Sequence, residues 1–248
     1  MTRILSALVV ATAAITASAM PAVAQSSLGF TAAEFDLGMT DSDDLMASAM
    51  VDIAITQYHG AQFNVGLSEQ TNGAIASVAG HLYMTPQDGH KYGLSLLFSD
   101  VDNASISYAQ IGAAGMVDLN DVMVLEVSGA MGMVMDNDLD WITTGAGLHW
   151  QARDDLRVYG AYNITEFDEA GFYALAQDAT VGARYLPNQG AFGVYAEASH
   201  DWLSGDNSAA GETTLELGIT LSLGATGGDK PAFTVFDPIR QIQRRGLY

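Results

Sequence analysis

The chain has 248 residues, no cysteine, and 29 acidic against 9 basic residues, which gives a formal net charge of −20. Disulfide cross-links are therefore excluded, and binding to nucleic acid through phosphate contacts is not expected from a chain of this sign. Hydrophobic residues make up 49% of the chain, yet beyond the N-terminus no run approaches the roughly 20 apolar residues of a membrane-spanning helix.

The N-terminus has the features of a cleaved export signal. Arg3 supplies a short positive region, an apolar run follows, and Ala22-Val23-Ala24 forms a small-residue cleavage site. We therefore expect residues 1–24 to be removed after export through the inner membrane. Residues 25–224 are enough for one all-β domain.

The body of the chain consists of segments in which apolar and polar residues alternate. In the clearest of them, Leu215, Leu217 and Ile219 would point one way and Glu216 the other. Successive side chains of a strand point to opposite faces, so each such segment predicts a strand with one apolar and one polar face. Twelve strands are expected, near residues 28–37, 45–56, 61–68, 73–84, 91–99, 105–118, 121–135, 140–152, 156–166, 172–186, 190–203 and 211–224. The first three alternate less clearly, so ten strands is the alternative.

The connections between these strands alternate between two kinds. Tight turns are expected at residues 86–89, 119–121, 153–155 and 187–190, where Pro, Asn, Asp and Gly gather. Longer acidic connections are expected between them, at residues 100–104, 136–140, 166–171 and 204–211. Lys91 and Arg153 are among the few basic residues, and both lie at or near the tight turns.

With its alternating strands, alternating connections, export signal and lack of cysteine, the chain resembles the Gram-negative outer-membrane β-barrel superfamily, and porins in particular. The resemblance covers about residues 27–224. It implies an all-β, antiparallel up-and-down transmembrane barrel in the cell outer membrane, with both chain ends in the periplasm. It also implies outer-membrane lipid and the barrel-assembly machinery as partners, no cofactor, and an oligomeric state that is open, an oligomer included.

The polar faces of the strands define the expected lumen. A charge on the lipid side costs a few kcal/mol near the bilayer midplane, so charged residues within strands are assigned inward. The residues expected to face the lumen are Glu126, His149, Arg157, Tyr159, Asp178, Arg184, Glu197 and Glu216. They form either an ion-pair lattice that fills a narrow lumen or a selectivity constriction. Gln177 would face lipid, which fits poorly, and Trp141, Trp150, Tyr185 and Trp202 are expected at the membrane interfaces.

Metal and catalytic motifs are weak. Asp136, Asp138 and Asp140 resemble the first half of a calcium loop, but Trp141 and Gly147 stand where that loop needs Gly and Glu. These three aspartates are a candidate weak surface site for divalent cations, or simply a solvated acidic loop.

The histidines show no zinc spacing, and no GxSxG motif is present. Pairing of His149 with Ser128, or of His200 with Asp201, is the basis for an enzyme acting on lipid at the rim. We do not expect an enzyme, because any barrel with many polar residues offers such pairs.

The tail, residues 225–248, has its own pattern. A Gly-rich linker precedes Asp237, a good N-cap, and Pro238 and Gly246 suit the start and end of a short helix. This helix is hypothesised to dock in or under the acidic lumen mouth or on a periplasmic partner, and a disordered tail is the alternative.

The function expected from the sequence is a porin-like barrel for passive diffusion of small cationic or neutral solutes, with a preference for cations. The first alternative is a non-conducting structural barrel whose acidic loops bind divalent cations or neighbouring molecules. The second is the rim enzyme acting on lipid.

Overall fold

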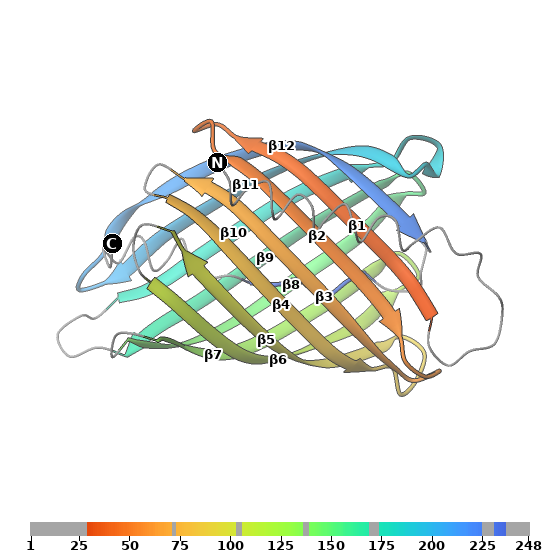
Figure 1. Cartoon of the computed structure of the whole chain (residues 1–248), viewed down its shortest axis with the longest axis horizontal. Coiled ribbons are helices and arrows are strands. Elements are labelled where there is room, and N and C mark those ends of the chain that lie inside the picture. Colours follow the sequence, from red (N-terminus) through yellow and green to blue (C-terminus); the bar gives the residue numbers. More distant parts are fainter. Residues whose placement is uncertain are drawn as a thin grey trace.

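The computed structural model describes residues 29–70, 73–102, 106–135, 139–168, 174–224 and 231–236. The expected export signal lies outside these residues. These described residues include twelve antiparallel strands that form one closed barrel. Figure 1 shows how the strands lie in the barrel. The strands are β1 (Gly29–Thr40), β2 (Leu45–Ala54), β3 (His59–Gln70), β4 (Gly73–Met84), β5 (His90–Val101), β6 (Ile106–Asn120), β7 (Met123–Val134), β8 (Asp140–Arg153), β9 (Leu156–Asp168), β10 (Ala174–Tyr185), β11 (Phe192–Gly205) and β12 (Ala209–Gly224).

The barrel closes because the first strand pairs with the last. The β1–β12 ladder runs from Ala32 opposite Gly224 to Thr40 opposite Glu216, and every other strand pairs with its neighbours in sequence. The prediction of an all-β up-and-down barrel with twelve strands is confirmed, and the ten-strand alternative is wrong. The weakly alternating early segments form β1, β2 and β3.

The barrel has two ends, a turn end and a loop end, which carry different connections between strands. The turn end carries the connections β2–β3, β4–β5, β6–β7, β8–β9 and β10–β11, together with the start of β1 and the end of β12. The loop end carries the other six connections.

No helix in the described part of the chain is long and apolar enough to cross a membrane.

The expected contrast in connection length is wrong. At the loop end β5 continues to Val101, β8 begins at Asp140 and β9 continues to Asp168, so the acidic residues expected in long loops belong partly to strands. The links 41–44 and 206–208 at the loop end are no longer than 85–89 and 186–191 at the turn end. Asp100 pairs with Ala76 and Asp140 with Asp168, so the ladders continue through these acidic residues.

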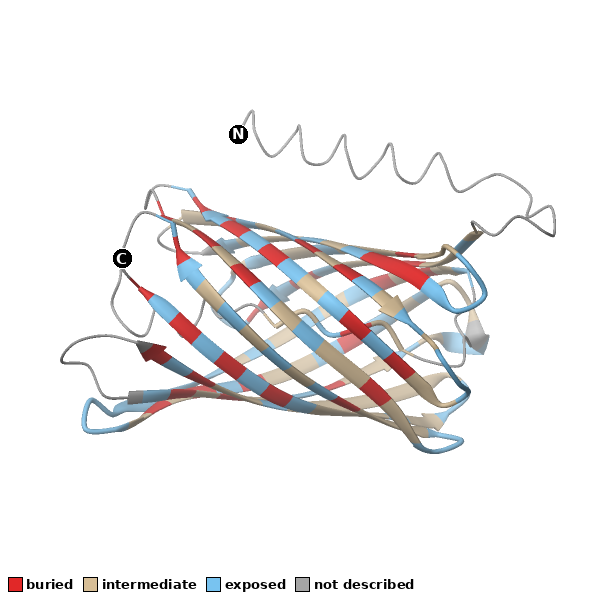
Figure 2. Cartoon of the chain, turned by 90° about the horizontal axis from the view of Figure 1, so that it is seen from below, coloured by how far each residue is buried: buried red, intermediate tan, exposed pale blue. Residues whose placement is uncertain are grey.

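The barrel wall has an apolar outer face and a polar inner face. Phe192, Leu94 and Leu217 are 72%, 68% and 67% exposed on the outside, whereas Gln62 and Glu126 are 0% and 4% exposed on the inside. Figure 2 shows this as exposed and buried residues that alternate along the strands. Outward side chains that are apolar and inward side chains that are polar fit a barrel surrounded by hydrocarbon.

Gln177, the polar residue that fitted poorly on the outer face, forms hydrogen bonds there. The hydroxyl of Tyr162 donates to Oε1 of Gln177, and Nε2 of Gln177 donates to Oγ of Ser204 at 2.5 Å. The ring of Trp202 lies 6.1 Å from that of Tyr162. The amide of Gln177 is therefore hydrogen-bonded to its neighbours on the wall.

One expected interfacial aromatic residue is instead inside the barrel. Trp141 is 1% exposed, its Nε1 donates to Oε1 of Gln110 at 3.0 Å, and its ring packs against Tyr108 and Phe167. The assignment was wrong because Ile142 faces outward, and strand alternation then turns its neighbour Trp141 inward. Trp150 and Tyr185 are 44% and 39% exposed on the outside, as expected.

Several inward aromatic rings lie flat against glycines of the neighbouring strands. Tyr159 pairs with Gly182, and Tyr195 with Gly218, and a Cβ at either glycine would clash with the ring. Trp141 covers Gly132 in the same way. Because glycine has no side chain, the rings lie along the wall and leave room in the lumen.

We predict that Leu217→Arg destabilises the barrel by about 2–4 kcal/mol, because it places a charge on the lipid-facing side near the middle of β12. Ser48→Arg is the matched control, because Ser48 faces the lumen opposite Asp36, and its effect should stay within about 1 kcal/mol. Urea unfolding in lipid vesicles measures both. Equal stability of the two variants would contradict the assignment of the outer face.

Candidate lumen site

The lumen contains one large cavity of about 630 Å³. Its wall comes mainly from β1–β3 and β8–β12, and residues 231–236 of the tail close its other side. The charged residues that line it are seven carboxylates and two arginines: Glu34, Asp36, Asp154, Asp155, Asp178, Glu197, Glu216, Arg157 and Arg184. The cavity is therefore strongly acidic.

The strongest ionic contacts in the cavity centre on Arg184 of β10. Its guanidinium forms an ion pair with Glu34, and Nη2 donates to Oδ2 of Asp36 at 2.9 Å. The three side chains are 12%, 24% and 16% exposed, and the guanidinium also lies over the ring of Tyr195. Since β11 and β12 separate β10 from β1, this cluster connects strands that share no ladder.

Two more carboxylates of the cavity accept hydrogen bonds from tyrosines. The hydroxyl of Tyr159 donates to Oε2 of Glu197 at 2.9 Å, and that of Tyr195 donates to Oε1 of Glu216 at 2.5 Å. Each hydroxyl is neutral, so its hydrogen bond positions the carboxylate without adding a positive charge. Asp178 likewise accepts from the neutral side chains Asn163 and Thr180, at 3.4 and 3.3 Å.

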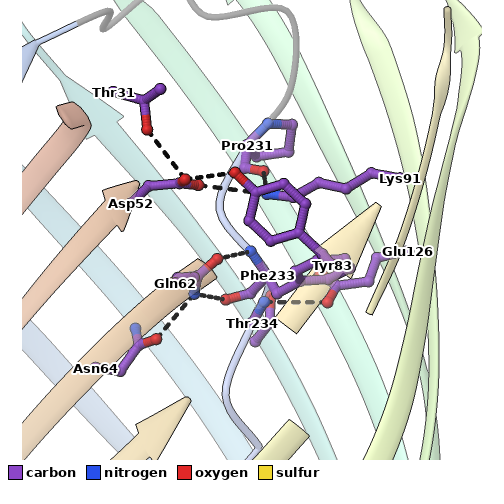
Figure 3. Close-up of polar contacts among 10 residues, drawn as sticks. All are labelled: Thr31, Asp52, Gln62, Asn64, Tyr83, Lys91, Glu126, Pro231, Phe233 and Thr234. Carbon is purple, nitrogen blue, oxygen red and sulfur yellow. Dashed lines mark hydrogen bonds and ion pairs between the residues drawn. The ribbon is translucent and has the colours of Figure 1, made fainter. Parts of the chain in front are cut away.

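The other side of the lumen holds the described part of the tail, residues 231–236, an extended segment that we call the lumen segment (Figure 3). Gln62 of β3 donates from Nε2 to the carbonyl of Phe233 at 2.9 Å and accepts from its N–H at 2.7 Å. Glu126 of β7 accepts from both the N–H and the hydroxyl of Thr234, at 3.0 and 2.9 Å. Gln110 of β6 donates to the carbonyl of Phe236 at 3.2 Å.

The ring of Phe233 is held in a pocket on β4 and β5. His81 stacks on it at 5.0 Å, and Tyr83 meets it edge-on at 6.0 Å. The ammonium of Lys91 lies 4.5 Å from the centre of the Phe233 ring and 4.2 Å from that of Tyr83. Phe233 itself is 2% exposed, as buried as a core residue.

Lys91 lies just after the β4–β5 turn, as expected, and it is also a buried lumen residue with 3% of its surface exposed. Its ammonium lies 3.6 Å from Oδ2 of Asp52 and donates to the carbonyl of Pro231 at 3.4 Å. A lysine can be buried here because a carboxylate neutralises it and two rings cover it.

The structure brings seven of the eight predicted lumen residues to the cavity. They are His149, Arg157, Tyr159, Asp178, Arg184, Glu197 and Glu216. Glu126 also points inward, but it holds Thr234 of the lumen segment, and its Oε2 lies 3.1 Å from Nε2 of His149.

Prediction from the sequence pattern missed Glu34 and Asp36 as lumen residues. Both alternate with apolar residues in β1, so the same parity rule identifies them once that strand is recognised. It also missed Gln62 and Gln110, because a neutral amide on a polar face carries no signal that another segment binds to it.

The expected metal and catalytic sites gain no support. Asp136 and Asp138 lie outside the described residues, and Asp140 is an exposed residue at the start of β8. In the described part of the chain no three His, Cys, Asp or Glu side chains come together to hold a metal ion.

The two candidate catalytic pairs are not formed. His149 contacts Glu126, not Ser128. His200 contacts Oγ1 of Thr213 on the outer face, whereas Asp201, the next residue, is buried on the inner face. The helix expected to start at Asp237 lies outside the described residues.

Comparison with known proteins places the fold. No protein-family model and no curated protein matches the chain. Among solved structures, the KdgM porin is similar with a TM-score of 0.55 and 10% identity, over 78% of this chain and 99% of that chain. The NanC porin in a rhombohedral crystal form is similar with a TM-score of 0.58 and 9% identity, over 77% of this chain and 100% of that chain. The chain therefore shares the barrel fold of these two porins.

We predict that Arg184→Met destabilises the barrel by about 1.5–3 kcal/mol, because it leaves Glu34 and Asp36 without their charged partner. Adding Glu34→Gln and Asp36→Asn to the same variant should recover most of the loss, since no unpaired charge is then left. Urea unfolding measures the free energy of unfolding of the single and the triple variant.

Arg153→Met is the control, because Arg153 pairs with Asp155 at the turn end with 68% of its side chain exposed. Its loss should cost less than about 1 kcal/mol. If Arg184→Met costs no more than this control, the Arg184 cluster does not contribute to stability.

Proposed function

We propose that the protein is a porin-like channel of the outer membrane that passes small solutes by passive diffusion and prefers cations. The observation that carries this proposal is the cavity inside the closed wall, with seven carboxylates against two arginines. A space between low-dielectric walls lined by one sign of charge concentrates counter-ions.

The arrangement of the charges supports a preference for cations over anions. Glu34 and Asp36 together hold the one guanidinium of Arg184, so this cluster as a whole stays negative. Glu197 and Glu216 are held by tyrosine hydroxyls, which carry no compensating charge. Rings of Asp and Glu side chains are one way in which channels select cations.

The outer face supports a location in the outer membrane. The exposed apolar residues of the wall need hydrocarbon around them, and the porin fold is one in which such a wall meets the outer membrane. An export signal at residues 1–24 is part of the same proposal.

One observation favours the alternative of a non-conducting structural barrel. The lumen segment fills the side of the lumen next to β3–β7, and an apolar cluster that includes Tyr108, Leu139, Trp141 and Phe167 packs inside at the loop end. If these groups block every path for ions, the barrel is structural. We do not propose an enzyme, because the pairs suggested for catalysis do not form.

We predict that the refolded protein gives discrete current steps in a planar bilayer, with a reversal potential under a salt gradient that indicates cation preference. Replacing Asp178, Glu197 and Glu216 by their amides should move the reversal potential toward that of a non-selective pore, because three charges leave the cavity wall while the side chains keep their shape. Silence at high protein load would favour the structural barrel.

The control removes the same number of charges from exposed positions away from the cavity: Asp88→Asn, Asp121→Asn and Glu166→Gln. Its reversal potential at high salt should stay close to that of the wild type, because exposed charges are screened over about 3 Å at 1 M salt. If both triple variants shift equally, the selectivity does not arise in the cavity.

A further inference from the structure

The lumen segment is bound largely by hydrogen bonds to its backbone N–H and C=O groups. Gln62 bonds to both backbone groups of Phe233, Glu126 bonds to the N–H of Thr234, and carbonyls at the two ends accept from Lys91 and Gln110. The wall groups come from four strands, β3, β5, β6 and β7. Figure 3 shows those of β3, β5 and β7, which are Gln62, Lys91 and Glu126. These contacts would suit any extended peptide, because they use groups that almost every residue has.

Side-chain recognition is concentrated at two neighbouring positions. The ring of Phe233 fills the pocket of His81, Tyr83 and Lys91. Gly93 completes this pocket, since a Cβ there would lie 3.1 Å from the ring. The hydroxyl of Thr234 donates to Glu126 as well. The site therefore selects an aromatic residue followed by a residue with a hydroxyl group.

The wall groups are arranged as a binding site whose occupant is not part of the wall. Gln62 is fully buried with the segment present, and its amide is positioned by a further bond from Nε2 to Oδ1 of Asn64 at 2.9 Å. The segment takes no part in any strand ladder. It can therefore leave without breaking the hydrogen bonds that close the barrel.

We propose that the wall of β3–β7 is a site for extended peptides, occupied in cis by the lumen segment, and that departure of the segment widens the conducting path. The vacated site would then bind a free peptide with the pattern aromatic–hydroxyl in trans. The effect of segment departure on conduction, which is the second part of this proposal, rests on the proposed function. The peptide site, which is the first part, does not.

The lumen segment lies where it limits the open cross-section of the lumen. Residues 231–236 form one side of the 630 Å³ cavity, and a second space of about 30 Å³ lies behind them against β4–β8. Release of the segment joins these two spaces. The seven carboxylates lie on the opposite wall and keep their positions.

The test uses the full-length chain with Phe233→Ala, which removes the buried ring and should lower the ratio of docked to released segment roughly a hundredfold or more. The probe is the peptide acetyl-PAFTVF-amide, the sequence of the lumen segment, with a fluorescent label. Anisotropy in detergent should show saturable binding to the variant and much weaker binding to the wild type. A scrambled peptide of the same composition should bind neither.

Two further variants locate the binding. Adding Gln62→Leu to Phe233→Ala should abolish peptide binding, whereas adding Gln151→Leu should not, because Gln151 lines the cavity from β8 and bonds to Arg153 and Arg157 instead. Thr234→Pro, which removes the N–H donated to Glu126, is a second way to release the segment if Phe233→Ala does not fold. Absence of peptide binding to a folded release variant overturns the site.

Single-channel conductance separately tests whether departure of the lumen segment widens the conducting path. The release variants should show a larger single-channel conductance than the wild type, and the unlabelled peptide should return it toward the wild-type value. Peptide binding without any current in any variant would sustain the site and reject the proposed channel. Unchanged conductance in a variant that conducts and binds the peptide would reject the role of the segment in the path.

Discussion

The structure depends on the pairing of β1 with β12. Inside hydrocarbon every backbone N–H and C=O group must find a partner within the protein, and an open sheet leaves one row of these groups unpaired at each edge. The ladder from Ala32 opposite Gly224 to Thr40 opposite Glu216 removes both edges. With no cysteine in the chain, this ladder takes the place that covalent cross-links have in many exported proteins.

Closure also decides where the charges go. A wall that faces lipid on the outside leaves the lumen as the place for ionisable side chains, and charges gathered there must be compensated or solvated. The chain solves this differently on the two sides of the lumen. On β1 and β8–β12 carboxylates surround a cavity, and four of them are held by Arg184 or by tyrosine hydroxyls: Glu34, Asp36, Glu197 and Glu216. On β3–β7 the amides of Gln62 and Gln110 and the carboxylate of Glu126 are satisfied by the backbone of the chain's own tail.

The alternation of residues was a good guide wherever a strand was clearly recognised. It placed Glu197 and Glu216 on the cavity wall, and it turned Glu126 inward as well. It was less useful at strand ends, where Trp141 was assigned by its closeness to an expected loop instead of by its parity. Connection lengths were also poorly predicted, because a strand ends where its partner ends and not where acidic residues begin.

The sequence by itself determined the class of the protein, because side-chain direction in a strand depends only on parity and the apolar set must face lipid. An antiparallel barrel with Arg184 and Glu216 facing inward followed from local pattern, which left ten strands as the alternative to twelve. Only the tertiary structure decided which inward groups meet, such as Arg184 with Glu34, and that Gln62 binds Phe233, 171 residues away. Such contacts join strands and segments that are distant along the chain, and neither composition nor periodicity records which of many polar inward side chains will come within hydrogen-bonding distance.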